Sequence, residues 1–252
     1  MKIHHLNCLK IVSPLSANVI GHCLLLEADK ELALVDTGLG LLDYQQPESR
    51  IGQALIDQAG FRLSEEQTAF RQIEKMGLDP SLVKNCILSH LDPDHAGGLA
   101  DFPNATVHVS SEELNSFLSG DPRYLPQQLA HQPTIKTYGP ATEKWFGLEA
   151  RKIEIDAFGE VYLTPLFGHT NGHSGVALRQ AGKWLWYIGD AYYVRGELSD
   201  ARHPVAQLSA ANASNPALQQ ASLQTIRLTI QQNPEIDFFG YHDIDEWDLY
   251  TN

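Results

Sequence analysis

The sequence predicts an α/β protein in which two mixed layers of β-sheet lie between helices. Three observations lead to this prediction. The 252 residues are 43% hydrophobic, which suits one large globular domain. Apolar runs follow the order strands, helix, strand, helix, strands, helix, strand. Two short clusters of histidine, at 90–95 and 169–173, come directly after two of the apolar runs.

Strands dominate the first third of the chain. The apolar runs 19–27 and 31–36 are joined by Ala28-Asp29-Lys30, which indicates a hairpin, and a glycine-rich turn follows at 37–40. Residues 41–66 show no clear pattern. We expect a helix over 67–76 that ends at Gly77, and then a buried strand over 86–89 that leads into His90.

The middle of the chain is less regular. A short strand is predicted over 106–109, and Ser110 with Glu113 forms a capping-box pattern that predicts a helix over 111–118. Residues 119–150 contain several Pro and Gly with four aromatic residues. We interpret a segment at about 110–150 as a lid or insertion over the site, and an ordinary surface connection is the alternative.

The final third returns to β-structure. Strands are predicted over 152–158 and 160–166, followed by a hairpin over 175–188 whose turn is Gln180-Ala181-Gly182. Asn215 and Pro216 predict the start of a helix over 216–231. The last strand, over 236–239, leads to His242.

Composition narrows the class of protein. The formal net charge is −13 with no basic block, so neither nucleic acid nor an anionic membrane is expected as a partner. No run of eighteen apolar residues occurs, and the first eight residues lack the pattern of a signal peptide. The three cysteines are too few for a disulfide framework. We expect a cytoplasmic protein with a small-molecule substrate, and a homodimer is left open.

The two histidine clusters carry the chemistry. His90, Asp92, Asp94 and His95 fall within six residues, and His169 follows another apolar run. Imidazole and carboxylate groups that converge from several strand ends are what a metal site requires, because each ligand must be aimed at one point from a rigid element. A few polar residues in ordinary turns are the alternative, which the later Asp190 and His242 make less attractive.

Residues 89–98 resemble the signature of the metallo-β-lactamase-fold hydrolases. Four further stretches resemble the same family in the same order, at 34–38, 168–174, 188–191 and 240–243. The resemblance implies a four-layer αββα sandwich with two divalent metal ions at one edge, within a single domain over 1–252. It also implies that His173 is a partner of the ligands and not a ligand. The implied ligands are His90 and His169 for the first metal, Asp94, His95 and His242 for the second, and Asp190 as a bridge.

Asp92 is the departure from the family pattern, since most of these hydrolases have a second histidine there. We predict that Asp92 completes the first metal site, although it could instead point away. Two dications with the three carboxylates of Asp92, Asp94 and Asp190 leave a net charge near +1, and a hydroxide brings it near zero. Such a site favours neutral esters or lactones over phosphodiesters. Zinc is expected, and carboxylate ligation also tolerates iron or manganese.

The resemblance implies hydrolysis by a hydroxide that bridges the two metals. Tyr193 follows Asp190 by three residues, a spacing similar to that in N-acyl-homoserine lactonases, where a tyrosine faces the substrate; it could instead be a packing residue. Asp94 is the candidate proton carrier. Lactonase or esterase activity is the first prediction. A thioesterase of the glyoxalase II kind, an iron-dependent oxidoreductase of the same fold and a non-catalytic binding module are the alternatives.

Overall fold

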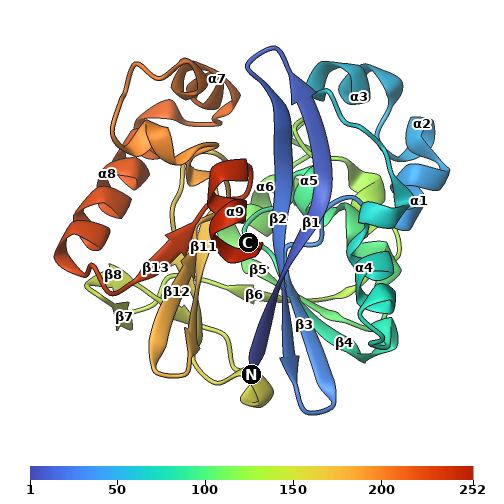
Figure 1. Cartoon of the computed structure of the whole chain (residues 1–252), viewed down its shortest axis with the longest axis horizontal. Coiled ribbons are helices and arrows are strands. Elements are labelled where there is room, and N and C mark those ends of the chain that lie inside the picture. The colour runs from blue at the N-terminus through green and yellow to red at the C-terminus, as the bar shows by residue number, and fades with distance from the viewer. Residues whose placement is uncertain (252) are drawn as a thin grey trace.

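Two β-sheets face each other at the centre of the molecule, with helices outside both (Figure 1). The computed structural model describes residues 1–251. The six-stranded sheet has the order β1-β2-β3-β4-β5-β6, with bounds Lys2–Ser13, Ser16–Ala28, Glu31–Val35, Val83–Ile87, Thr106–Ser110 and Thr134–Tyr138. The five-stranded sheet has the order β13-β12-β11-β10-β9, with bounds Asp237–Phe239, Lys183–Tyr187, Ser174–Gln180, Val161–Pro165 and Arg151–Lys152. β7 (Lys144–Trp145) and β8 (Leu148–Glu149) form a separate hairpin.

Helices cover the outer faces of both sheets, which completes the predicted αββα sandwich. In Figure 1, α7 and α8 lie on one side of the sheets and α1 to α4 on the other. The helices are α1 (Leu41–Gln45), α2 (Pro47–Arg50), α3 (Gln53–Ala59), α4 (Ala69–Lys75), α5 (Pro93–Ala96), α6 (Ser111–Leu118), α7 (Pro204–Asn212), α8 (Pro216–Gln232) and α9 (Ile244–Thr251). α8 confirms the prediction, because the Asn215 side chain accepts a hydrogen bond from Leu218 N and Pro216 opens the helix.

The parallel strands of the first sheet explain where the functional side chains gather. β3 pairs with β4, β4 with β5, and β5 with β6, all in parallel, while β1 and β2 are antiparallel to their neighbours. Parallel strands inside a sheet are buried on both faces, and β3 accordingly is apolar after Glu31, whereas β4 is buried except at Lys84. Their carboxyl ends lie at one edge of the sheet, so the residues that follow Val35 and Ile87 meet there.

Side-chain alternation places the second sheet between two cores. On β12, Leu185 and Tyr187 join the core between the sheets, while Trp186 joins a second core with Leu223 and Ile226 of α8. This alternation is the pattern of a sheet that is covered on both faces. The outer core holds α8 in place, and α8 lies beside the loops that carry the second histidine cluster.

Two local predictions were wrong. Residues 152–158 were expected as one strand, but only Arg151 and Lys152 pair with β10, and Asp156–Phe158 form a 3-10 turn that ends at Gly159, whose φ is +71°. The helix expected from 67 begins instead at Ala69, because the side chain of Thr68 caps it by accepting from Arg71 N. Residues 2–13, for which no individual strand was predicted, form the long strand β1.

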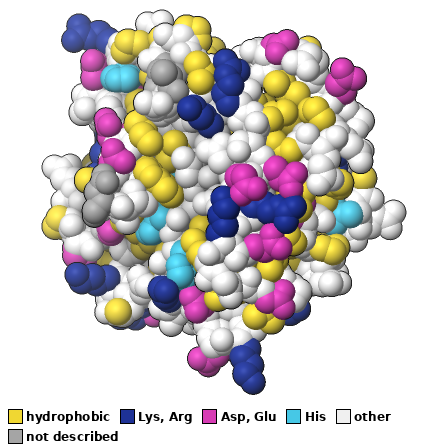
Figure 2. Space-filling model, turned by 45° about the vertical axis from the view of Figure 1, so that its right-hand side comes forward, with side chains coloured by type: hydrophobic (Ala, Val, Ile, Leu, Met, Phe, Trp, Pro, Cys, Tyr) yellow, Lys and Arg dark blue, Asp and Glu magenta, His cyan; other side chains and the backbone are white. Residues whose placement is uncertain are grey.

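The surface matches the composition. Figure 2 shows acidic and basic side chains interspersed on one face of the molecule, without a block of either sign. Within residues 1–251, the helices are all too short or too polar to cross a lipid bilayer.

Candidate metal centre

Six of the seven predicted ligands form two compact groups. One ligand atom each from His90, His169 and Asp190 lies within 4.8 Å of the others, and all three residues are buried. The second group consists of Asp94, His95 and His242, again with ligand atoms within 4.8 Å of one another. The residues come from both sheets, since Asp94 and His95 lie on α5 after β4, whereas Asp190 and His242 follow β12 and β13.

Asp190 lies between the two groups. Its Oδ2 is 3.4 Å from His169 Nε2 and 3.4 Å from His242 Nε2, while its Oδ1 is 3.4 Å from His95 Nε2. Burial opposes the charge on this carboxylate, but His242 and His95 outweigh it and hold the pKa of Asp190 well below its usual value. The arrangement suits a carboxylate that is shared by two cations.

The short helix α5 delivers two ligands from one turn. Asp92 is its N-cap residue and Pro93 occupies its first position, where the missing N–H of proline costs nothing. His95 N donates to Asp92 O at 3.0 Å, which closes the turn. Asp94 and His95 therefore leave the backbone side by side and reach the second group together.

Hydrogen bonds behind the rings turn three histidines toward the centre. His90 Nδ1 lies 2.9 Å from Ser89 Oγ, and His242 Nδ1 donates to Ile20 O at 2.8 Å. His95 Nδ1 donates to Asp36 Oδ2 at 2.8 Å. Such contacts fix the ring orientation and leave Nε2 free as the ligand atom.

A metal ion fits the unpaired atoms that this arrangement leaves. His90 Nε2, His95 Nε2 and Asp190 Oδ1 are buried without a hydrogen-bond partner. A buried polar atom without a partner costs free energy, so several of them that converge are a sign of a ligand. Nitrogen and carboxylate oxygen together match the ligand set of zinc and of similar divalent metals.

Asp92 lies beside the first group. Its Oδ2 is 3.3 Å from His90 Nε2 and 3.2 Å from His169 Nε2, so its side chain points toward the site. Its carboxylate also forms an ion pair with Arg123. Burial opposes the charge, but Arg123 and His90 keep the pKa of Asp92 well below its usual value. Sequence reasoning missed Arg123.

Two predicted supporting residues also reach the site. His173 Nε2 accepts a hydrogen bond from Asp190 N at 3.0 Å, so it holds the backbone of the central carboxylate. The ring of Tyr193 stands edge-on to His169 and His242, with ring centres 5.8 Å and 5.3 Å apart. Burial raises the pKa of Tyr193 well above its usual value, so its phenol keeps its proton at neutral pH.

Glu113 is a second residue that sequence reasoning missed as part of the site. The capping-box pattern was right in one respect, because Ser110 Oγ accepts from Glu113 N at 3.1 Å. The carboxylate of Glu113, however, accepts from Leu91 N at 2.9 Å, from Thr170 Oγ1 at 2.6 Å and from Gly172 N at 3.1 Å. This buried group thus ties the loop of His90 to the loop of His169.

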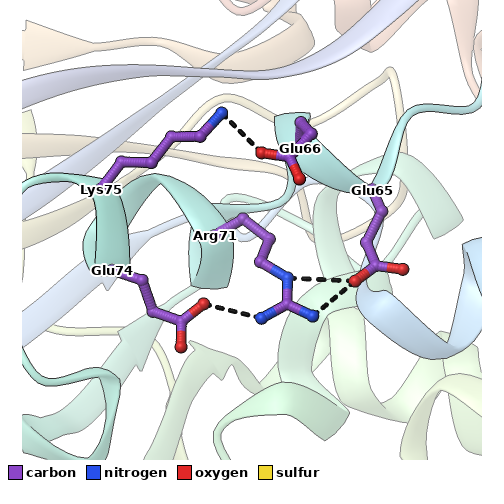
Figure 3. Close-up of a pocket in the computed structure, with 5 residues that line it drawn as sticks. All are labelled: Glu65, Glu66, Arg71, Glu74 and Lys75. Carbon is purple, nitrogen blue, oxygen red and sulfur yellow. Dashed lines mark hydrogen bonds and ion pairs between the residues drawn. The ribbon is translucent and has the colours of Figure 1, made fainter.

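Cys8, one of the three cysteines, is fully buried, and its Sγ accepts a hydrogen bond from Gln72 Nε2 at 3.6 Å. A surface depression elsewhere is lined by Glu65, Glu66, Arg71, Glu74 and Lys75 (Figure 3). These charged side chains pair with one another, as in Arg71 with Glu65 and Glu74, so the depression is an exposed ion-pair network.

Comparisons with known proteins agree with this geometry. Residues 18–241 match the Metallo-beta-lactamase superfamily. A probable metallo-hydrolase of Mycobacterium tuberculosis is 34% identical over 99% of this chain and 82% of its own length. An N-acyl homoserine lactonase of Bacillus thuringiensis is 26% identical over 89% of this chain and 81% of its own length.

Solved structures give the same answer for the fold. An N-acyl homoserine lactone hydrolase with the product N-hexanoyl-L-homoserine at its catalytic metal center superposes with a TM-score of 0.75 at 20% identity, over 98% of this chain and 95% of that one. A dizinc quorum-quenching lactonase gives 0.59 at 20% identity, over 90% and 74%. With the matched residues and the two ligand groups together, the chain belongs to the metallo-beta-lactamase superfamily and is a metal-dependent hydrolase.

Proposed function

We propose that this hydrolase opens a neutral ester-like bond, with a lactone as the first candidate substrate and two divalent metal ions as cofactors. The observation that carries the proposal is the pair of adjacent ligand groups that share Asp190. Bound cations would supply a hydroxide at neutral pH and would polarise the carbonyl oxygen. The proposed ligands are His90, Asp92 and His169 on one side, Asp94, His95 and His242 on the other, and Asp190 between them.

Two side chains of the proposal act on protons. Tyr193 stands against both ligand groups and keeps its phenolic proton, so it donates a hydrogen bond to the carbonyl or leaving oxygen. The Asp94 Oδ2 atom is 3.7 Å from His242 Nε2 and 3.9 Å from His95 Nε2. Burial raises the pKa of Asp94, which suits a carboxyl that carries a proton to the leaving group.

The charge of the site bears on the substrate class. Asp92, Asp94 and Asp190 carry three negative charges against the four positive charges of two dications, and a hydroxide would carry the fourth. Arg123, which pairs with Asp92, adds one positive charge beside the first group, so a phosphodiester is the decisive comparison in the substrate panel. The similarity to N-acyl homoserine lactonases points to a lactone ring within this class. Three further features stay predictions from the sequence. They are a single domain over 1–252 with a lid at about 110–150, a cytoplasmic location and a homodimer.

One experiment tests the proposal. Metal content is measured on the purified chain, and the same sample is assayed on a panel of lactones, esters, thioesters and phosphodiesters. We expect about two divalent metal ions per chain and the highest kcat/KM on a lactone or ester.

In the same assay, Tyr193→Phe should lower kcat/KM, because the variant cannot donate the phenolic hydrogen bond. A variant with full kcat/KM would remove the phenol from the mechanism. Faster turnover of a phosphodiester than of any lactone or thioester would overturn the substrate class. Oxygen uptake by an iron-loaded sample would indicate redox chemistry instead.

A further inference from the structure

A guanidinium group lies against the first group of ligand atoms. Arg123 belongs to the turn between α6 and the 3-10 helix Pro126–Leu129, and its side chain is only 19% exposed. Its Nε donates to Asp92 Oδ1 at 2.6 Å, and its Nη2 donates to Asp92 Oδ2. A two-point pair of this kind fixes both side chains in one plane. The carboxylate is therefore already engaged by a cation that the chain itself supplies.

The same guanidinium reaches a second ligand. Arg123 Nη2 lies 2.7 Å from His169 Nε2, the nitrogen that also faces Asp190. An imidazole nitrogen offers one lone pair, which either accepts an N–H or binds a metal ion. His169 also differs from the other three ligand histidines, because its buried Nδ1 has no hydrogen-bond partner behind the ring. The His169 ring is thus held by the contact of its Nε2 with Arg123, whereas the other three rings are held by contacts of their Nδ1 atoms.

The third nitrogen of the guanidinium holds it in place. Arg123 Nη1 donates to Asn212 O at 2.6 Å, at the end of α7. The donors of Arg123 are thus directed at Asp92, His169 and Asn212, and the group is positioned by the fold rather than left free for a substrate anion.

The second group of ligands has a different environment. His95 Nε2 is unpaired and faces Asp190 and Asp94, and His242 Nε2 faces the same two carboxylates. A dication that enters there meets two carboxylates that pair with no Lys or Arg among residues 1–251, whereas in the first group the Arg123 guanidinium already offsets the charge of Asp92. Like charges at such short range repel strongly in a buried site.

We propose that Arg123 is a displaceable cationic occupant of the first metal position, which competes with a metal ion for Asp92 Oδ2 and His169 Nε2. The two positions then bind metal unequally, and the group of Asp94, His95 and His242 fills first. Occupation of the first position requires the guanidinium to release His169. This inference rests on the proposed two-metal site and adds a side chain that sets how readily the second ion is taken up.

The test is a Zn²⁺ titration of the full-length chain after removal of metal with a chelator. Calorimetry gives the affinity of each equivalent, and equilibrium dialysis with metal analysis gives the stoichiometry. In the wild-type chain we expect one tight equivalent and one weaker equivalent. Arg123→Gln should tighten the weaker equivalent by about tenfold or more, the scale on which outer contacts change metal affinity, and leave the tight one unchanged.

Two further variants make the result specific. Arg71→Gln removes an arginine that also bridges carboxylates, but in the exposed network of Figure 3, and it should change neither equivalent. Arg123→Lys keeps the charge but loses the planar fork, so its weaker equivalent should fall between wild type and Arg123→Gln. If thermal melting shows that Arg123→Gln does not fold, the inference is judged on Arg123→Lys, whose weaker Zn²⁺ equivalent should still bind more tightly than that of the wild type.

Three outcomes count against the inference. A weaker second equivalent in Arg123→Gln would mean that Arg123 orients Asp92 as a ligand and does not compete with the metal. An unchanged second equivalent, or two equal equivalents in the wild type, would also overturn it while leaving the two-metal hydrolase intact. A chain that binds no Zn²⁺ in any variant would instead contradict the proposed function itself.

Discussion

Among the described residues, a pair of histidines on β1 and β2, with His5 half-buried and His22 buried, can be compared with the buried histidines of the candidate metal centre, because their nitrogens face different groups. In the pair on β1 and β2, His5 Nδ1 and His22 Nε2 lie 2.7 Å apart and bond to each other. Aromatic rings surround this pair, with Tyr250 stacked on His5 at 4.4 Å and Phe239 tilted against His22 at 4.2 Å. His22 Nδ1 is buried without a partner, as are the Nε2 atoms of His90 and His95 in the candidate metal centre. Within residues 1–251, however, only the latter two belong to groups of converging ligand atoms.

The surrounding charges separate His95 from the pair on β1 and β2. Burial lowers the pKa of His5 to about 4, against a partial opposing effect of Asp237, and lowers the pKa of His22 well below its usual value. Burial acts in the same direction on His95, but Asp190 and Asp36 outweigh it and raise its pKa well above the usual value. Burial also lowers the pKa of His90 well below its usual value, so the direction of the pKa shift does not by itself mark a metal site. The candidate metal centre differs from the pair on β1 and β2 because its histidine Nε2 atoms converge on the carboxylates of Asp92, Asp94 and Asp190.

The largest expected effect comes from the central carboxylate. Asp190→Asn removes the charge that both ligand groups share, so metal content should fall and kcat should drop by about 10³-fold, the equivalent of several kcal/mol. His22→Phe, in the other group, should keep full metal content. Metal analysis and steady-state kinetics on the best substrate check both variants. If Asp190→Asn and His22→Phe lost metal equally, the two groups of histidines would not differ in metal binding.

A smaller effect on metal binding is expected from Glu113, which connects the loops of His90 and His169. Glu113→Gln removes the charge that accepts hydrogen bonds from Leu91, Thr170 and Gly172, and metal affinity should weaken by about 10–100-fold. The neighbouring Glu112 pairs with Arg151 instead, so Glu112→Gln is the matched control and should bind metal normally. Competition with a chromophoric chelator measures both affinities. Unchanged affinity in Glu113→Gln would show that the loops hold without the charge.

The smallest effect at neutral pH concerns stability, because it develops only in acid. The pKa of His5 is about 4 in the folded chain and 6.5 in the reference state, so the unfolded chain takes up the proton first as the pH falls. This contribution to the free energy of unfolding is complete above pH 6.5 and is lost progressively down to pH 4, by at most about 1.4 kcal/mol per unit. Urea unfolding at several pH values should give a shallower slope for His5→Phe. An identical slope would assign the acid sensitivity to other groups.

Sequence alone predicted most of the residues that the fold brings together at the candidate metal centre, because these residues follow strand ends in recognisable short patterns. His90, His169, Asp190 and His242 are far apart in the chain, yet each comes directly after an apolar run, and the sheets bring those ends to one edge. A different local signal predicted α8, namely the N-cap residue Asn215 followed by Pro216 at the first position of the helix.

The residues that were missed act through contacts that no local pattern encodes. Arg123 lies in a segment without periodicity, 31 positions from Asp92, and only the folded chain brings the two together. Glu113 fits a local capping rule, but the loops packed against α6 draw its carboxylate away from that role. Tertiary packing overrides local preference at such places.

The ligands of the centre come from both sheets, and this has a consequence for how the protein survives. A chain in which the sheets have separated possesses no complete binding site, so a metal ion binds the native state and not the unfolded one. At a free ion concentration a hundred times the dissociation constant, this coupling adds about 2.7 kcal/mol to the native state. Removal of the cation would thus lower the free energy of unfolding as well as the activity.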